Sequence, residues 1–213
     1  MITDLRSKLE RLSVKQHTAP PKHDISADIS GEIFSRSNGA FIIKKSCFAL
    51  GTGYGDGRLE NNEELFGLSD KLVFMDTETT GLGAGACPFL IGAAYYKNDS
   101  LVLEQIFMRD LDDEEAALSY IIERFSGMTV VTFNGKAFDV PLIKGRCIIN
   151  SVKAENFASE QIDLLHLSRR IWKKRLESCR LGTIEEEILK FARDNDINGS
   201  LIPELYKKYL ITG

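Results

Sequence analysis

The chain has 213 residues, of which 43% are hydrophobic, and its formal net charge is -4 at neutral pH. This length and hydrophobic content fit a globular chain with a substantial core and exclude global disorder. No apolar run reaches the ~18 residues of a transmembrane helix, and residues 1–12 are too polar for a secretory signal, so we expect a cytoplasmic protein with no membrane partner. The small negative charge argues against a protein that coats nucleic acid, but it allows a local basic track.

The N-terminal part of the chain divides into a polar segment and a predicted hairpin. Residues 1–30 contain a Pro-Pro pair that breaks any helix, and we expect a flexible segment there. Around Asn38-Gly39, β-branched and aromatic residues on both sides are typical of a β-hairpin. We therefore expect a β-hairpin extension over residues 31–66 and a main domain over residues 67–213.

The main domain is predicted to be a β-β-β-α-β unit followed by helices. Its predicted strands are Leu72–Met75, Phe89–Tyr96, Leu101–Met108 and Met128–Phe133. Its predicted helices are one capped by Asp112 and Asp113 that runs to Phe125, then Val140–Ile149, Leu164–Leu176, Thr183–Arg193 with a capping box from Thr183 to Glu186, and Ile202–Leu210. A helix between strands implies a parallel crossover, so the pattern predicts an α/β fold whose mixed sheet has three antiparallel strands, one or two parallel ones, and helices on both faces.

Two acids, Asp76 and Glu78, directly follow the apolar strand Leu72–Met75, where an unpaired carboxylate is costly to bury. Side chains two apart on a strand share a face and lie about 6.6 Å apart. Carboxylate oxygens are the ligands that Mg²⁺ and Mn²⁺ prefer, and two-metal sites activate water for phosphodiester hydrolysis. Asp139, just beyond the next apolar strand, is a third candidate. If the two strands are neighbours, the three carboxylates converge.

Two motifs carry a family resemblance: DTETTG at Asp76–Gly81 and NGKAFDVPLI at Asn134–Ile143. Together and in this order they resemble the first two motifs of the DnaQ-like (DEDD) 3′-5′ exonucleases of the ribonuclease H-like fold. The chain looks most like the YprB-like ribonuclease H-like domain proteins, on the segments TFNGKAFDVPL, IDLLHLSRRIW, CRLGTIEEEIL and PELYKKYL. The resemblance covers residues 66–213. It implies a central mixed β-sheet flanked by helices and metal-dependent hydrolysis at the 3′ end of a single-stranded DNA or RNA.

The resemblance also implies roles for single residues. Asp76, Glu78 and Asp139 become the catalytic ligands of Mg²⁺ or Mn²⁺. Candidate substrate-binding residues are Thr79, Asn134 and Phe138, and the basic run that follows Asp163 adds Arg169 and Arg170. A basic track would hold phosphates, whereas the alternative is a solvated helix face with Trp172 in the core.

The chain departs from the family pattern at the fourth acid. No His-x-x-x-x-Asp or Tyr-x-x-x-Asp follows Asp139, and Asp163 is either a substitute ligand or, as in most such enzymes, not a ligand. Relatives of this type continue past the position of Gly213 into a helix that carries the last acid. Either the domain lacks this last catalytic helix, or the site works, if at all, with three acids. We therefore expect one well-bound divalent ion and slow hydrolysis.

Two further functions stay open from the sequence. One is an inactive ribonuclease H-like module that binds nucleic acid or a protein, and the other is an endonuclease of the ribonuclease H or resolvase type. The glycines of Gly81–Ala86 imitate a dinucleotide fingerprint, but Cys87-Pro88 and a strand follow where a helix should receive the pyrophosphate. The four cysteines contain no CxxC pair, which predicts reduced, structural thiols. The sequence does not indicate an oligomeric state.

Overall fold

The computed structural model describes residues 31–49, 71–83, 85–98, 100–193 and 197–212. The predicted flexible segment 1–30, the second half of the predicted hairpin extension from residue 50 to 66, and the predicted domain start at residue 67 lie outside these ranges. All four cysteine thiols are free. Within the described ranges, no helix combines the length and the apolar character needed to cross a bilayer.

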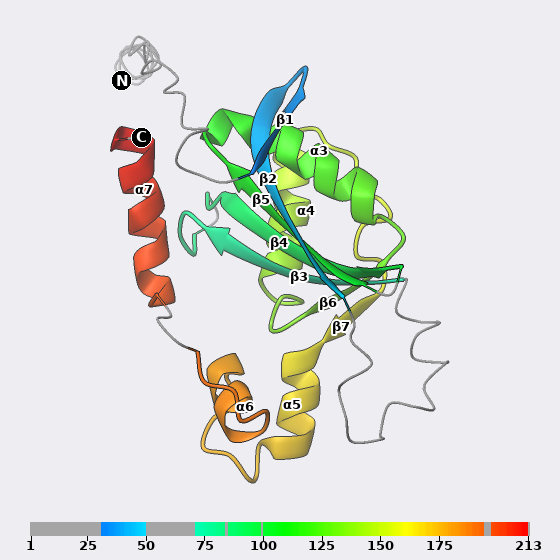
Figure 1. Ribbon diagram of the computed structural model, residues 1–213, viewed down its shortest axis with the longest axis vertical. Helices are drawn as coiled ribbons and strands as arrows, with labels where there is room; N and C mark the ends of the chain where they lie inside the picture. The colour runs from blue at the N-terminus through cyan, green and yellow to red at the C-terminus, as the bar shows by residue number, and fades with distance from the viewer. Residues whose placement is uncertain (1–30, 50–70, 84, 99, 194–196, 213) are drawn as a thin grey trace, which may run out of the picture.

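A single mixed sheet of seven strands forms the centre of the fold (Figure 1). The strands are β1 (Glu32–Arg36), β2 (Gly39–Ala49), β3 (Leu72–Thr79), β4 (Pro88–Lys97), β5 (Ser100–Met108), β6 (Thr129–Thr132) and β7 (Gln161–Asp163). Their order in the sheet is β1-β2-β5-β4-β3-β6-β7. Strands β3, β6 and β7 are parallel to each other, and the remaining pairs are antiparallel. The predicted α/β class and mixed sheet are confirmed.

The hairpin is continuous with this sheet, because β2 pairs with β5 from Phe41 to Ala49. Its turn lies one residue earlier than predicted: Arg36 pairs with Gly39, so Ser37 and Asn38 form the loop. Gly39 has a φ of 146°, and an added Cβ there would lie 3.2 Å from the Asp113 Cα atom. Glycine is therefore needed where the hairpin passes close to the start of the next helix, rather than inside the turn itself.

Five described helices flank the sheet (Figure 1). They are α3 (Glu114–Phe125), α4 (Asp139–Ile149), α5 (Leu164–Trp172), α6 (Leu181–Glu187) and α7 (Ile202–Thr212), with short 3₁₀ turns at Leu111–Asp113 and Gly199–Leu201. Helices α5 and α6 are shorter than predicted. The three-residue strand β7 was not predicted, because it is too short to show a strand period.

The predicted helix caps differ from the observed ones in two places. Asp113 is the N-cap residue of α3, but its side chain makes no hydrogen bond to that helix; it accepts from the backbone N–H of Ala40 and, in the capping box of the preceding 3₁₀ turn, from that of Asp110. Helix α6 begins at Leu181, so Thr183 lies inside it and cannot form the predicted capping box. In both cases the side chain that was expected to cap a helix contacts another group. Asp113 accepts from the backbone N–H of Ala40, and the Thr183 hydroxyl donates to the Ser178 hydroxyl.

Helices α3 and α4 cover one face of the sheet and share one core with it. Buried members of this core include Val73, Ile91, Ile106, Ile121 and Ile143. Along β4 and β5 the alternate side chains, which point to the opposite face, are only half-buried. At one end of that face, Tyr206 and Tyr209 of α7 pack on Phe107, and this contact gives the predicted second helical layer.

Candidate active site

The acidic residues gather at one edge of the sheet. The carboxyl ends of parallel strands meet at the same edge, which is where ligands bind in open α/β sheets. Strand β3 ends at Thr79, β6 ends at Thr132, and β7 ends at Asp163. The topology therefore brings Asp76, Asp139 and Asp163 to a single region, although they come from three separate segments.

Asp76 and Glu78 lie within β3, which continues to Thr79 and is longer than predicted. Their side chains point to the face opposite the buried Met75, because side chains alternate along a strand. Asp76 is exposed and Glu78 is half-buried. The register between β3 and β4 is irregular after Glu78, where the regular ladder ends. Asp76 is therefore the member of this pair that opens to solvent.

Asp139 is the first residue of α4 and is 5% exposed. Its carboxylate accepts a hydrogen bond from the Thr77 hydroxyl, which joins the start of α4 to the middle of the Asp76–Glu78 pair. Thr77 points to the face that α4 covers, since it alternates with Asp76. The positive end of the α4 dipole also favours a negative charge at this position. Asp139 is thus fixed in place before any ligand binds.

Both carboxylates have pKa values above the ordinary range of an aspartate. Loss of surrounding water raises the pKa of Asp76, and the negative charge of Asp139 raises it further, while Arg193 acts in the opposite sense. Burial raises the pKa of Asp139 as well; the Thr77 hydrogen bond opposes this rise, and the charge of Asp163 adds to it. A bound cation would favour the ionised form of both acids and so lower their raised pKa values.

Among the described residues, no group of three or more His, Cys, Asp or Glu side chains is placed to hold a metal ion. The predicted convergence of three carboxylates is therefore still a prediction. The Asp76–Asp139 pair alone has the donor chemistry of a hard divalent ion.

Asp163 has a different environment from the other two aspartates. It caps α5 and is 6% exposed. One carboxylate oxygen accepts from the backbone N–H of Asn134 at 2.8 Å and of Leu165 at 2.9 Å, and the other accepts from Lys136 N–H at 3.1 Å. Both oxygens are thus engaged by the protein. These contacts support a structural role for Asp163, which ties the loop before Asp139 to α5.

The same loop depends on Gly135. A Cβ added there would lie 2.7 Å from an Asp139 carboxylate oxygen and 2.6 Å from the Thr132 Cβ atom, so a larger side chain would displace one of them. The preceding residue, Asn134, has a left-handed φ of 72°. Glycine is needed at position 135 because the backbone packs closely against the candidate catalytic acid there.

The candidate substrate residues are not all equally available. Asn134 is exposed and Phe138 half-buried, and both belong to the loop that leads into Asp139. Thr79 is buried, and its hydroxyl donates to the Gly81 carbonyl oxygen at 2.8 Å, which stabilises the loop after β3. Arg169 and Arg170 are exposed in the last turn of α5. Their predicted roles in binding substrate are still predictions.

Two polar residues near the acids were not identified from the sequence. In the sequence, Thr77 only separates Asp76 from Glu78, although strand alternation alone predicts that its side chain points to the face of the sheet that α4 covers. Arg193 lies beyond α6, where its guanidinium pairs with both oxygens of Glu185 at 2.7 and 2.8 Å. Its charge also acts on Asp76. No local pattern brings Arg193 to β3, because that proximity comes from the path of the chain after α6.

Comparisons with known proteins agree with this architecture. A family model described as the RNase_H superfamily matches residues 73–213. The uncharacterized protein YprB of Bacillus subtilis (strain 168) is 37% identical over 146 residues, which make up 66% of this chain and 35% of the relative. The chain therefore spans about a third of the length of that relative.

Two solved structures are similar over much of the chain. Exonuclease I of E. coli, in complex with a dA16 oligonucleotide, matches 66% of this chain and 40% of its own at 15% identity and a TM-score of 0.45. NrnC of Brucella melitensis with bound Mg²⁺ matches 73% of this chain and 76% of its own at 12% identity and a TM-score of 0.38. These scores are too low to transfer an activity or a substrate.

Proposed function

This chain belongs to the RNase_H superfamily, and from that premise we propose that it is a metal-dependent nuclease acting on nucleic-acid phosphodiester bonds. Within this class, we propose hydrolysis from the 3′ end of a single strand, with Mg²⁺ or Mn²⁺ at Asp76, Asp139 and Glu78. One observation carries the proposal: the hydroxyl of Thr77, the residue between Asp76 and Glu78 in β3, donates to the carboxylate of Asp139 at the start of α4, so acids from two separate segments meet at this edge of the sheet.

The residues have distinct tasks in this proposal. A bound divalent ion supplies a Lewis acid and a more acidic water. Asp139, held by Thr77 and by the N-terminus of α4, provides a fixed anionic oxygen. Asp76 faces solvent and provides the oxygen at the entrance. Glu78, on the same face of β3 as Asp76, is the third candidate ligand.

A 5′-labelled single strand, incubated with Mn²⁺ or Mg²⁺, tests this function directly. We expect a ladder that shortens from the 3′ end for the native chain and no ladder for Asp76→Ala. Internal cuts would instead indicate an endonuclease, and an intact strand under both metals would contradict the proposed hydrolysis.

The alternative function, a binding module without catalysis, is favoured by one observation: no three-donor group forms among the described residues. Retention of the strand without cleavage would support this alternative. Calorimetric titration with Mn²⁺ further distinguishes the nuclease from the binding module. For a nuclease with an incomplete set of acids we expect one tight site that is lost in Asp76→Ala, and two tight sites would contradict an incomplete set.

A further inference from the structure

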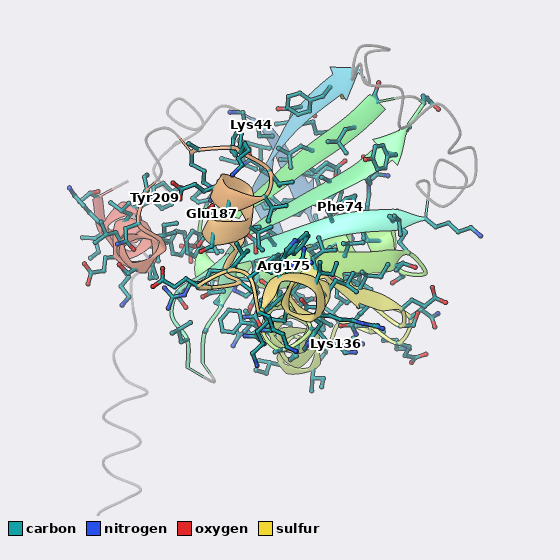
Figure 2. The ribbon with its side chains drawn as sticks, turned by 90° about the horizontal axis from the view of Figure 1, so that it is seen from below. Lys44, Phe74, Lys136, Arg175, Glu187 and Tyr209 are labelled. Atoms are coloured by element: carbon teal, nitrogen blue, oxygen red, sulfur yellow. The ribbon has the colours of Figure 1, made fainter. Side chains whose placement is uncertain are left out.

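A hollow of about 350 Å³ lies next to the candidate active site, between the end of β7 and α5. Its lining residues are Lys136, Gln161, Ile162, Asp163, His166 and Leu167. Figure 2 shows Lys136 beside α5, on the same side of the molecule as Arg175. The volume is near the lower end of ligand sites in proteins, which run from ~300 to 1,000 Å³. The hollow is thus large enough for one flat ring system.

Its walls combine an apolar surface with basic side chains. Ile162 and Leu167 are 38% and 46% exposed, which is high for such large apolar side chains, and they form one wall. Lys136 and His166 provide the exposed polar groups at the rim. The acid in the lining, Asp163, is buried and accepts three backbone hydrogen bonds. A ligand with an aromatic face and an adjacent anion fits this combination.

Basic side chains of α5 and its C-cap continue from the hollow. His166, Arg169, Arg170 and Lys173 follow the spacing i, i+3, i+4 and i+7, so they share one face of the helix, and all four are exposed. Positively charged grooves that track a backbone, together with surfaces on which bases stack, are how proteins hold single-stranded nucleic acid. These four side chains and the hollow together therefore fit a single-stranded nucleic acid rather than a free small anion.

The hollow is also linked to the candidate active site by one short loop. Lys136 lines the hollow, and Asp139 is only three residues further along, in the acid pair. Strands β3, β6 and β7 are successive neighbours in the sheet, so the ends of β3 and β7 are separated by roughly 10 Å. A stacked strand rises about 3.4 Å per nucleotide, so some three nucleotides would cover that distance.

We propose that this hollow is a subsite for a nucleotide about three positions from the scissile bond, with the base against Ile162 and Leu167 and its phosphates on Lys136 and His166. The subsite rests on the proposed function for its place relative to the scissile bond. It is a separate binding surface, however, and it holds nucleic acid whether or not the acids catalyse hydrolysis.

Fluorescence anisotropy in EDTA measures binding to a labelled single strand and so tests the subsite without any cleavage. Lys136→Ala is the main variant, because the Asp163 hydrogen bond uses its backbone N–H and survives the substitution. Lys207→Ala, an exposed lysine on α7, is the matched control. We expect Lys136→Ala to raise the dissociation constant several-fold and to reduce the salt slope by about 0.7, the loss of one phosphate contact to a single strand.

Leu167→Asp tests the apolar wall and should weaken binding by about tenfold or more, because it removes the apolar contact to the base and places a negative charge beside the phosphates. Equal affinity of Lys136→Ala and Lys207→Ala for the strand would overturn the subsite. Weaker binding by the variants, with no cleavage by the native chain under any metal, would retain the subsite and reject the nuclease.

Discussion

One acid inside the sheet and two acids at its edge have opposite environments. Glu104 of β5 is 0% exposed, and its carboxylate accepts from Tyr95 and Tyr120 at 2.8 Å and lies 3.2 Å from Lys45 and 3.3 Å from Arg124. Burial alone would raise the pKa of Glu104, but these hydrogen bonds and charges lower it below its usual range. At the edge of the sheet, the pKa values of Asp76 and Asp139 are raised instead.

The difference separates a structural acid from a candidate catalytic one. Glu104 has more donors than it needs to remain ionised, so its charge is satisfied inside the protein. Asp76 and Asp139 both have raised pKa values, mainly because they are partly removed from water, so their ionisation costs stability that a ligand can recover. Natural proteins accept such costs where a site must bind something. Substitutions at the two groups should therefore have opposite effects on stability and on activity.

The largest effect is expected from Asp139→Asn. The amide can still accept the Thr77 hydrogen bond, so the local structure persists, but the anionic oxygen is lost. We expect the rate of strand cleavage to fall roughly 10³-fold, which corresponds to the several kcal/mol that a catalytic metal site supplies. Initial rates on a 5′-labelled strand measure this loss. A decrease smaller than tenfold would remove Asp139 from the proposed site.

Glu104→Gln should show the opposite pattern. Removing the charge gives the tyrosine hydroxyls a poorer acceptor and removes the partner of Arg124; because Arg124 is 36% exposed and can be solvated, we expect a loss of about 1–3 kcal/mol. Urea denaturation measures the free energy of unfolding. Glu115→Gln, on the exposed side of α3, is the control and should change stability by less than about 0.5 kcal/mol. Below its melting temperature, Glu104→Gln should cleave at the native rate.

Thr77→Val tests the positioning of Asp139 and should have an intermediate effect. Valine keeps the shape of the side chain but removes the donor to the carboxylate. Loss of a group that orients a metal ligand typically reduces activity or metal affinity by about 10–100-fold. Thr77→Ser restores the hydroxyl and should recover most of the rate. If Thr77→Val and Thr77→Ser cleave equally, the hydrogen bond does not position the acid.

The smallest effect concerns stability in EDTA. Because the pKa of Asp139 is raised in the folded state, ionisation costs the folded chain more than the unfolded chain, and stability falls as the pH rises through this raised value. Asp139→Asn removes the cost, so it should melt above the native chain at neutral pH, by about 2–4 °C for each kcal/mol of repulsion removed. The difference should vanish in acid, where the native carboxyl is protonated. A lower melting temperature for Asp139→Asn at neutral pH would show that Thr77 and α4 already compensate the charge.

Local patterns were sufficient to predict most elements of the fold. The apolar runs before Asp76 and before Asn134 became the central strands β3 and β6, and the helix between them became α3, because burial periodicity is recorded in neighbouring residues. Strand β7 was missed because three residues carry no period. The pairing of β2 with β5 was also missed, because it joins residues about 60 positions apart and depends on which edge of the sheet is open.

The sequence by itself determined the central strands, the crossover helix, the placement of Asp76 and Glu78 along the first of these strands and that of Asp139 beyond the next, because each depends on neighbouring residues. Only the tertiary structure decided which acids are satisfied. The donors to Glu104 come from β4, α3 and β2, and those to Asp163 include the loop after β6, so no local pattern distinguishes these acids from Asp76. A carboxylate becomes structural or available for a ligand according to how many donors distant segments bring to it.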